Sequence, residues 1–516
     1  MTSRSARLLV IVVSGVLAVA GSLAAAEPPR QLSDLNRPIG AVSSGFTADG
    51  QWLLFTVDST IRTQSELYIM PADGDASDVV KLGDTLTGAS EISDDNTRVV
   101  FSLADVGLVS VPVTGGAPTV LVPVESGLSA RAVAITPGDL VIFSYVPPGA
   151  TQSEYFSVPL AGGVVSQLSQ LPNSNWRISG MVMVPDGGRI IYGAAIQRRT
   201  ALFTVPTTGG NPVLISHPLQ GSQQINAFAV TPDGARVIYR VGTFVNDRIL
   251  ADDLYSVAAD GSSPAVLVHD GYSVGTGQVS GGTWGADQFF FTADDKLFFV
   301  DSNASVSDLY LSEFDGSGKT SLGSEPVIAE YWWRPQDGVL FHQRDTFPFS
   351  MSVRPLAGPS TLLSVHPQGN LARGVATVTP DGQQVAYAAF VQTGQRLDAY
   401  SATAAADPPV RLNDPFASDD DVVAIAATDT RAIFAREDRL VSVPLGGGAE
   451  AFLTEPYFDR DRFGQSDVFP DQSAVKLEAS FTGPQAEELF KVPAGGGPVE
   501  RLSPGTVEVT GTVSGH

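Results

Sequence analysis

Cysteine is absent from the 516-residue chain, which excludes disulfide bonds, thiolate metal sites, cysteine nucleophiles and a lipid-anchored N-terminal cysteine. Charged residues make up only 17% of the chain, and 55 acidic residues outnumber 31 basic ones. The formal net charge of −24 repels nucleic acid and anionic lipid, so neither is expected as a partner. After the N-terminal segment, no apolar run approaches the ~20 residues that a membrane-spanning helix needs.

The first thirty residues, MTSRSARLLVIVVSGVLAVAGSLAAAEPPR, have the pattern of a secretory signal peptide. Arg4 and Arg7 supply the positive region, and Leu8–Ala20 is an apolar core. Small residues ending at Ala26 suit cleavage by signal peptidase. We therefore predict a signal peptide over 1–26 and a periplasmic or secreted mature chain without a membrane span. The alternative is an uncleaved membrane anchor.

Glycine and proline are abundant, with 52 and 35 copies, which favours many short strands joined by turns. The segment VTPDGARVIY (230–239) recurs as VTPDGQQVAY (378–387), and degenerate copies of it occur about every 45 residues. Ten such units fill residues 46–503, with one longer step of 61 residues. Repetition on this scale predicts stacked supersecondary units rather than a conventional globular domain.

Each unit reads as four strands, A to D, separated by turns. Proline fixes φ near −65°, aspartate bonds back to nearby backbone N–H groups, and glycine accepts a positive φ, so the Pro-Asp-Gly segment predicts a tight A–B turn. The second half of a unit, as in YFSVPLAGG (155–163) and LVSVPLGGG (440–448), predicts strand C and a Gly-Gly turn into strand D. Such short turns join antiparallel neighbours.

These motifs resemble the WD40-like β-propeller repeat of the TolB-like family, over nearly all of residues 46–503. The resemblance implies an all-β propeller of about ten four-stranded blades in one ring. The alternative is two tandem propellers split near residues 270–288, where the long step falls. The chain lacks the N-terminal α/β domain of TolB, so TolB's role does not carry over. Residues 27–45 form an N-terminal segment with a candidate ring-closing strand, and 504–516 form a C-terminal tail.

Strand alternation places the A–B and C–D turns on one face and the B–C and D–A loops on the other. The first set is short and repetitive, whereas the second differs in every unit, and variable loops on a rigid frame are where binding concentrates. Aromatic residues beside arginines suit peptide or sugar recognition, although such rings also pack between blades. The candidate ligand-binding residues on this face are Trp176, Arg177, Tyr331, Trp332, Arg334, Arg344 and Phe347.

The segment DRDRFGQSD offers a candidate metal site. Asp459, Asp461 and Asp467 have a spacing that resembles calcium loops of other propeller repeats, in which alternate carboxylates face one hard cation. Phe463 departs from that pattern, and the intervening arginines could neutralise the acids instead. Apart from this calcium site, no cofactor is predicted.

The sequence gives little support for catalysis. GYSVG (271–275) matches G-x-S-x-G, but the residues after Ser273 do not favour the helix that a serine elbow needs. His217 and His269 fall at the ends of D strands, where a structural role is expected. We predict a binding scaffold for a protein, peptide or glycan. The alternative is a propeller enzyme, a polysaccharide lyase or hydrolase, acting at the channel mouth through converging acids or histidines.

Overall fold

The structure is a computed structural model that describes residues 39–502 apart from several connections. The undescribed stretches within this range are 48, 60–63, 125–129, 148, 172, 174, 197–198, 246–247, 272–288, 293, 303–305, 327, 335–338, 345–350, 356–360, 363–370, 382, 393–395, 404–408, 413–421, 437–438, 454–462, 470, 480–487 and 497–499. Within the described residues, no helix is long and apolar enough to cross a bilayer.

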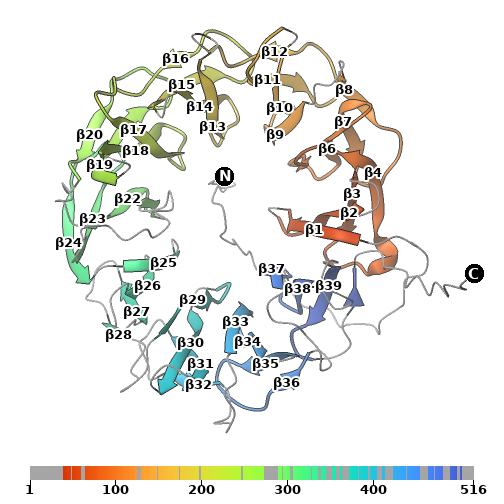
Figure 1. Cartoon of the computed structure of the whole chain (residues 1–516), viewed down its shortest axis with the longest axis vertical. Coiled ribbons are helices and arrows are strands. Elements are labelled where there is room, and N and C mark those ends of the chain that lie inside the picture. The colour runs from red at the N-terminus through yellow and green to blue at the C-terminus, as the bar shows by residue number, and fades with distance from the viewer. Residues whose placement is uncertain are drawn as a thin grey trace, which may run out of the picture.

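Ten antiparallel units of four strands, numbered here as blades 1 to 10 in chain order, surround a central axis in a single ring (Figure 1). Strand A of each blade lies innermost and strand D outermost (Figure 1). Blades 1 and 2 are joined into one eight-stranded sheet through a single pairing between Leu86 and Leu103. The prediction of a single ten-bladed propeller is confirmed, and the alternative of two tandem propellers is wrong.

The strands follow the predicted A–B–C–D order in every blade. The A strands are β1 (Ile39–Phe46), β5 (Glu91–Ile92), β9 (Arg131–Ile135), β13 (Arg177–Met183), β17 (Gln223–Val230), β21 (Phe289–Phe291), β25 (Ile328–Arg334), β29 (Leu371–Val378), β33 (Val422–Ala427) and β37 (Phe463–Val468). The B strands are β2 (Trp52–Ser59), β6 (Arg98–Leu103), β10 (Leu140–Tyr145), β14 (Arg189–Ile196), β18 (Arg236–Val245), β22 (Lys296–Ser302), β26 (Val339–Arg344), β30 (Gln384–Gln392), β34 (Arg431–Arg436) and β38 (Ala474–Ala479).

Strands C and D complete each blade on its outer side. The C strands are β3 (Gln64–Pro71), β7 (Gly107–Pro112), β11 (Glu154–Pro159), β15 (Arg199–Pro206), β19 (Arg248–Ala258), β23 (Val306–Glu313), β27 (Met351–Pro355), β31 (Arg396–Thr403), β35 (Arg439–Pro444) and β39 (Glu488–Pro493). The D strands are β4 (Val80–Leu86), β8 (Thr119–Pro123), β12 (Ser166–Gln167), β16 (Val213–Leu214), β20 (Val266–His269), β24 (Thr320–Pro326), β28 (Thr361–Leu362), β32 (Val410–Arg411), β36 (Ala451–Phe452) and β40 (Glu500–Arg501). One short 3₁₀ helix, η1 (Ala76–Asp78), precedes β4.

The A–B turn explains the repeated Thr-Pro-Asp-Gly segment. In blade 5 the Thr231 hydroxyl donates to Asp233 Oδ1 (2.5 Å) and accepts the N–H of Arg236 (3.0 Å), while the N–H of Ala235 donates to the same carboxylate oxygen (3.0 Å). The turn therefore satisfies its own polar groups. Gly234 completes it at φ +72°, a conformation that side chains disfavour.

The glycine-containing turn between strands C and D packs against the preceding blade. Gly261 of blade 5 has φ +77°, and a Cβ placed there would lie 2.9 Å from Val213 Cγ1 on the D strand of blade 4. Gly447 of blade 9 stands in the same relation to Val410 of blade 8, at 3.2 Å. Glycine is needed here both for its backbone conformation and for the close approach of neighbouring sheets.

The hydrophobic core lies between the blades, because alternate residues of each B strand face opposite neighbours. In β14, Ile190 and Tyr192 join the cluster shared with blade 3, whereas Ile191 joins the cluster shared with blade 5. In six blades, directly paired aromatic residues of strands B and C stack with ring centroids 5.2–5.8 Å apart. These pairs are Phe55–Tyr68, Phe143–Phe156, Tyr192–Phe203, Tyr239–Tyr255, Phe299–Tyr310 and Tyr387–Tyr400.

Buried hydroxyl groups on the C strands link successive blades through hydrogen bonds. Each donates to the carbonyl oxygen just after strand C of the following blade. The bonds are Ser157 to Thr207 (2.7 Å), Ser256 to Phe314 (2.5 Å), Ser401 to Leu445 (2.6 Å) and Ser442 to Ala494 (2.6 Å).

The ring closes where blade 10 packs against blade 1, without exchange of strands among the described residues. Phe46 meets Phe469 edge-on at 4.9 Å within the buried cluster that the two blades share. We expected a terminal strand to close the ring, but β40 is the outer strand of its own blade. The first blade also begins at Ile39, so the propeller extends N-terminal to the predicted boundary at residue 46. Besides the segment VERLS (499–503), which contains β40, the sequence offers RQLSD (30–34) and TVEVTGTV (506–513) as closing strands, and both lie outside the described residues.

Candidate functional site

The two faces of the ring use their arginines differently. We call the face with the A–B and C–D turns the constant face and the opposite face, with the B–C and D–A connections, the variable face. On the constant face, arginines that begin strand B bond through Nε to a hydroxyl of strand C. These bonds are Arg98 to Ser110 (2.6 Å), Arg189 to Thr204 (3.0 Å), Arg236 to Ser256 (2.7 Å) and Arg431 to Ser442 (2.7 Å).

The variable face of blades 3 and 4 carries arginines whose side chains make no such bond to a hydroxyl of strand C in the described residues. Arg131 and Arg177 are the first residues of the inner strands β9 and β13, which are neighbours in the ring (Figure 1). Both side chains are exposed, and neither has a hydrogen bond or ion pair in the described part of the chain. They can therefore meet a ligand without breaking an existing contact.

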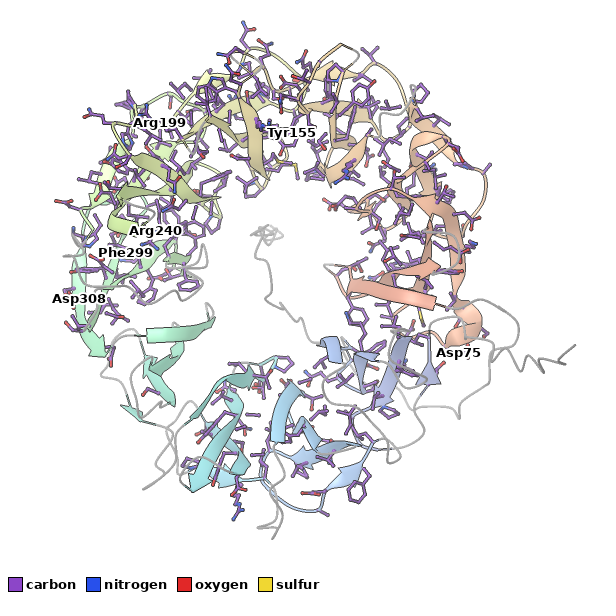
Figure 2. The ribbon with its side chains drawn as sticks, viewed as in Figure 1. Asp75, Tyr155, Arg199, Arg240, Phe299 and Asp308 are labelled. Atoms are coloured by element: carbon purple, nitrogen blue, oxygen red, sulfur yellow. The ribbon has the colours of Figure 1, made fainter. Side chains whose placement is uncertain are left out.

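Arg199, labelled in Figure 2, begins β15 after the B–C connection and so adds a third guanidinium group at the variable face of blade 4. Its Nη2 donates to the carbonyl oxygen of Gly221 (2.7 Å), which ties the B–C hairpin of blade 4 to the next D–A loop. Arg177 pairs with Ala195, and Ala195 pairs with Thr200, the neighbour of Arg199. Two inter-strand spacings separate the backbones of the two arginines, about 10 Å.

Trp176, predicted as a ligand contact, precedes β13 on the variable face. Its ring is partly buried and packs against the cluster between blades 3 and 4. Its backbone N–H donates to the carbonyl oxygen of Asn173 (3.1 Å), which fixes the loop just before Arg177. Trp176 thus supports the position of Arg177, and its own binding role stays a prediction.

The predicted aromatic segment of blade 7 lies in a strand rather than in a loop. Tyr331 and Trp332 belong to β25, opposite residues of β26. Arg334 ends β25 next to the A–B connection, so it lies toward the constant face and not on the variable face where we predicted it. Arg344 ends β26 at the variable face, as expected. Phe347 lies outside the described residues.

The calcium prediction stays a prediction. Asp467 lies in β37, paired with Lys476, whereas Asp459 and Asp461 lie outside the described residues. Within the residues that the structure describes, no group of three histidine or carboxylate side chains is placed to hold a metal ion. Ser273 of the GYSVG segment also lies outside the described part.

His269 lies in a polar cluster between blades 5 and 6. The sequence predicted only that His269 ends a D strand and did not reveal the other members of this cluster. Its Nε2 lies 2.7 Å from Asp301 Oδ2, and its Nδ1 lies 3.2 Å from Lys319 Nζ. The ring also contacts Phe299 and Tyr310. Because the lysine ammonium only donates, Nδ1 accepts in that contact and Nε2–H donates to Asp301, so both ring nitrogens are used in packing blade 5 against blade 6.

His217 has a comparable structural place between blades 4 and 5. Its ring stacks on Tyr255 with centroids 4.1 Å apart, and Nδ1 lies 3.0 Å from the Tyr239 hydroxyl. Burial lowers the pKa of His217, so the imidazole stays neutral in this packing. Neither histidine reaches the inner strands, where the predicted channel mouth would lie.

Carboxyl groups with raised pKa values lie apart from one another. Burial raises the pKa of Glu91, the first residue of the inner strand β5, to about 7. Burial also raises the pKa of Asp253 in β19 of blade 5, with Asp270 as a further cause. The two carboxyl groups with raised pKa values in the described residues therefore lie in blades 2 and 5 and do not form a converging pair.

No family model matches the chain, and no curated protein matches it. Among solved structures, it is similar to a putative TolB from Agrobacterium tumefaciens, with 18% identity, a TM-score of 0.29, and coverage of 46% of this chain and 82% of that one. An oligogalacturonate lyase from Vibrio parahaemolyticus shares 12% identity at a TM-score of 0.37, covering 62% and 91%. Dipeptidyl peptidase 4 from Porphyromonas gingivalis shares 12% identity at a TM-score of 0.49, covering 78% and 64%. At such identities the likeness concerns the fold.

Proposed function

We propose that this chain is an exported, non-catalytic propeller scaffold that binds a protein, peptide or glycan through its variable face. The supporting observation is the contrast between the two sets of arginines. On the constant face, Arg98 and Arg431 are held by hydroxyls of their own blade. On the variable face, Arg131 and Arg177 are exposed and have no partner in the described part of the chain. Exposed arginines on a rigid frame are frequent energetic centres of binding surfaces.

A capture experiment tests this proposal. The immobilised mature protein is incubated with periplasmic and extracellular fractions of the producing cells, and retained molecules are identified. We expect Arg131→Ala and Arg177→Ala to reduce retention of a partner that the unmodified protein captures. The matched control is Gln51→Ala, an exposed residue of an A–B turn on the constant face, which should leave capture unchanged. Equal capture by all variants would count against binding through the variable face. N-terminal sequencing of the mature protein tests export, and a chain that does not start at Glu27 would count against it.

The alternative of a propeller enzyme acting at the channel mouth is favoured by one observation. Glu91 begins an inner strand at the variable end, and its pKa of about 7 would let it exchange a proton near neutral pH. If the chain cleaves an acidic or neutral polysaccharide, Glu91→Gln should abolish turnover while leaving binding intact. Product formation that persists in Glu91→Gln would remove Glu91 from the mechanism.

A further inference from the structure

Successive inner strands of blades 3, 4 and 5 begin with a hydrogen-bond donor at the variable face. These first residues are Arg131 of β9, Arg177 of β13 and Gln223 of β17, and we call them the donor row. The Oε1 atom of Gln223 accepts the N–H of Gln220 (2.9 Å), so the amide nitrogen remains as the group that faces a ligand. All three residues therefore offer donors.

The chain around Arg177 and Gln223 is almost free of acids, although the whole protein carries a net charge of −24. Residues 155–232 contain four arginines and a single carboxylate, Asp186. That carboxylate lies in an A–B turn on the constant face, where it accepts the N–H of Gly188 (2.8 Å). The acid just before this segment, Glu154, is already engaged by the hydroxyl of Ser169 and the N–H of Leu171.

We propose that the donor row binds an acidic peptide segment, with carboxylates of the peptide meeting Arg131 and Arg177 in bidentate contacts. This inference rests on the proposed function and specifies the ligand of the same face. A guanidinium group presents paired N–H donors that match a carboxylate, and the pair of arginines has no competing partner in the described residues. Arg199, at the edge of the same blade, adds positive charge.

An acidic peptide suits this surface better than an acidic glycan. Sugar recognition by aromatic residues needs a ring with an open face, and the Trp176 ring beside the donor row is packed against the blade 3–4 cluster. Among the described strands, the inner ones have no neighbour on the side of the axis, and the unpaired backbone of an edge strand can pair with an extended peptide. Backbone pairing and two carboxylate contacts would act together.

The test uses an acetylated, amidated octaglutamate peptide with a fluorescent label, and polarisation reports its binding to the full-length mature chain. We expect Arg131→Gln and Arg177→Gln each to weaken binding about tenfold, because each removes a charge-assisted contact. Binding should also weaken with added salt. The charge-matched control is Lys296→Gln on the constant face, which pairs with Glu313 (3.3 Å) and should leave binding unchanged. Unchanged thermal unfolding of both arginine variants would show that they remain folded.

The outcomes separate the inference from the function on which it rests. If octaglutamate does not bind, or binds the arginine variants equally well, the acidic-peptide assignment is overturned. The assignment is also overturned if oligogalacturonate binds more tightly than octaglutamate and the same arginine variants lose that binding. The donor row would then be assigned to an acidic glycan. In either case the scaffold function still stands if Arg177→Ala reduces capture of a natural partner. If that capture is unchanged as well, both proposals fail.

Discussion

Replacing Glu91 with glutamine should make the protein more stable at alkaline pH and leave it unchanged at acidic pH. Glu91 begins β5 on the inner side of blade 2, and its backbone pairs with Val100 in the buried strand β6. Burial is the cause that raises its pKa, from 4.5 to about 7. The carboxyl group of Glu91 therefore binds its proton more tightly in the folded chain than in the unfolded chain.

The sign and size of the effect follow from this difference in pKa. Below pH 4.5 the carboxyl is protonated in both states, so the folded state bears no penalty. Between 4.5 and about 7 the unfolded chain releases the proton first, and the free energy of unfolding falls as the pH rises. The full difference corresponds to about 3 kcal/mol, which is an upper bound because the side chain is partly exposed.

Urea unfolding of the two proteins at about pH 4.5 and about pH 8 measures the effect. Glutamine is neutral at both values, so Glu91→Gln should match the parent at acidic pH and exceed it by up to about 3 kcal/mol at pH 8. Asp95→Asn provides a variant of opposite sign. Hydrogen bonds from Ser93 and Thr97 lower the pKa of Asp95, so its carboxylate stabilises the fold above pH 3.8 and loses that effect as the pH falls.

The reasoning would be refuted if the parent and Glu91→Gln lost stability in parallel between these pH values. A glutamine variant that is less stable at both would show that the ionised carboxylate makes a favourable contact. A loss of stability in Asp95→Asn that is about equal at the two pH values would show that the measurement resolves single carboxyl groups, because Asp95 is ionised above pH 3.8.

Two further changes test the contacts between blades. Ser157→Ala removes the hydrogen bond to the Thr207 carbonyl and should cost about 1–3 kcal/mol in urea unfolding, because a buried acceptor is left unsatisfied; a loss below about 0.5 kcal/mol would contradict a role in joining blades 3 and 4. Gly261→Ala should lower the free energy of unfolding by more than about 1 kcal/mol. Gly149→Ala has a similar φ of +82° but open space around it, so it should cost less, and equal losses would mean that the contact with Val213 is not the cause.

The blade architecture could be predicted from sequence because each turn is encoded within a few residues. Thr231 and Asp233 close the A–B turn through their own side chains, and Gly261 supplies a conformation that few residues adopt. The inner strands carry a weaker signal. The first of them, Ile39–Phe46, is rich in small residues and was not separable from the N-terminal segment. Closure of the ring depends on packing between residues at opposite ends of the chain, which no local pattern encodes.

The candidate site was less accessible to sequence reasoning, because a side chain's availability depends on partners far along the chain. Arg98 and Arg177 both precede an apolar run and look alike in sequence. The guanidinium of Arg98 is held by Ser110, which reaches it only because strands B and C are paired. Arg177 begins strand A, which has no neighbouring strand on the side of the axis, among those the structure describes, to supply such a hydroxyl. Position within the blade, rather than residue type, therefore determines which arginines remain free to bind.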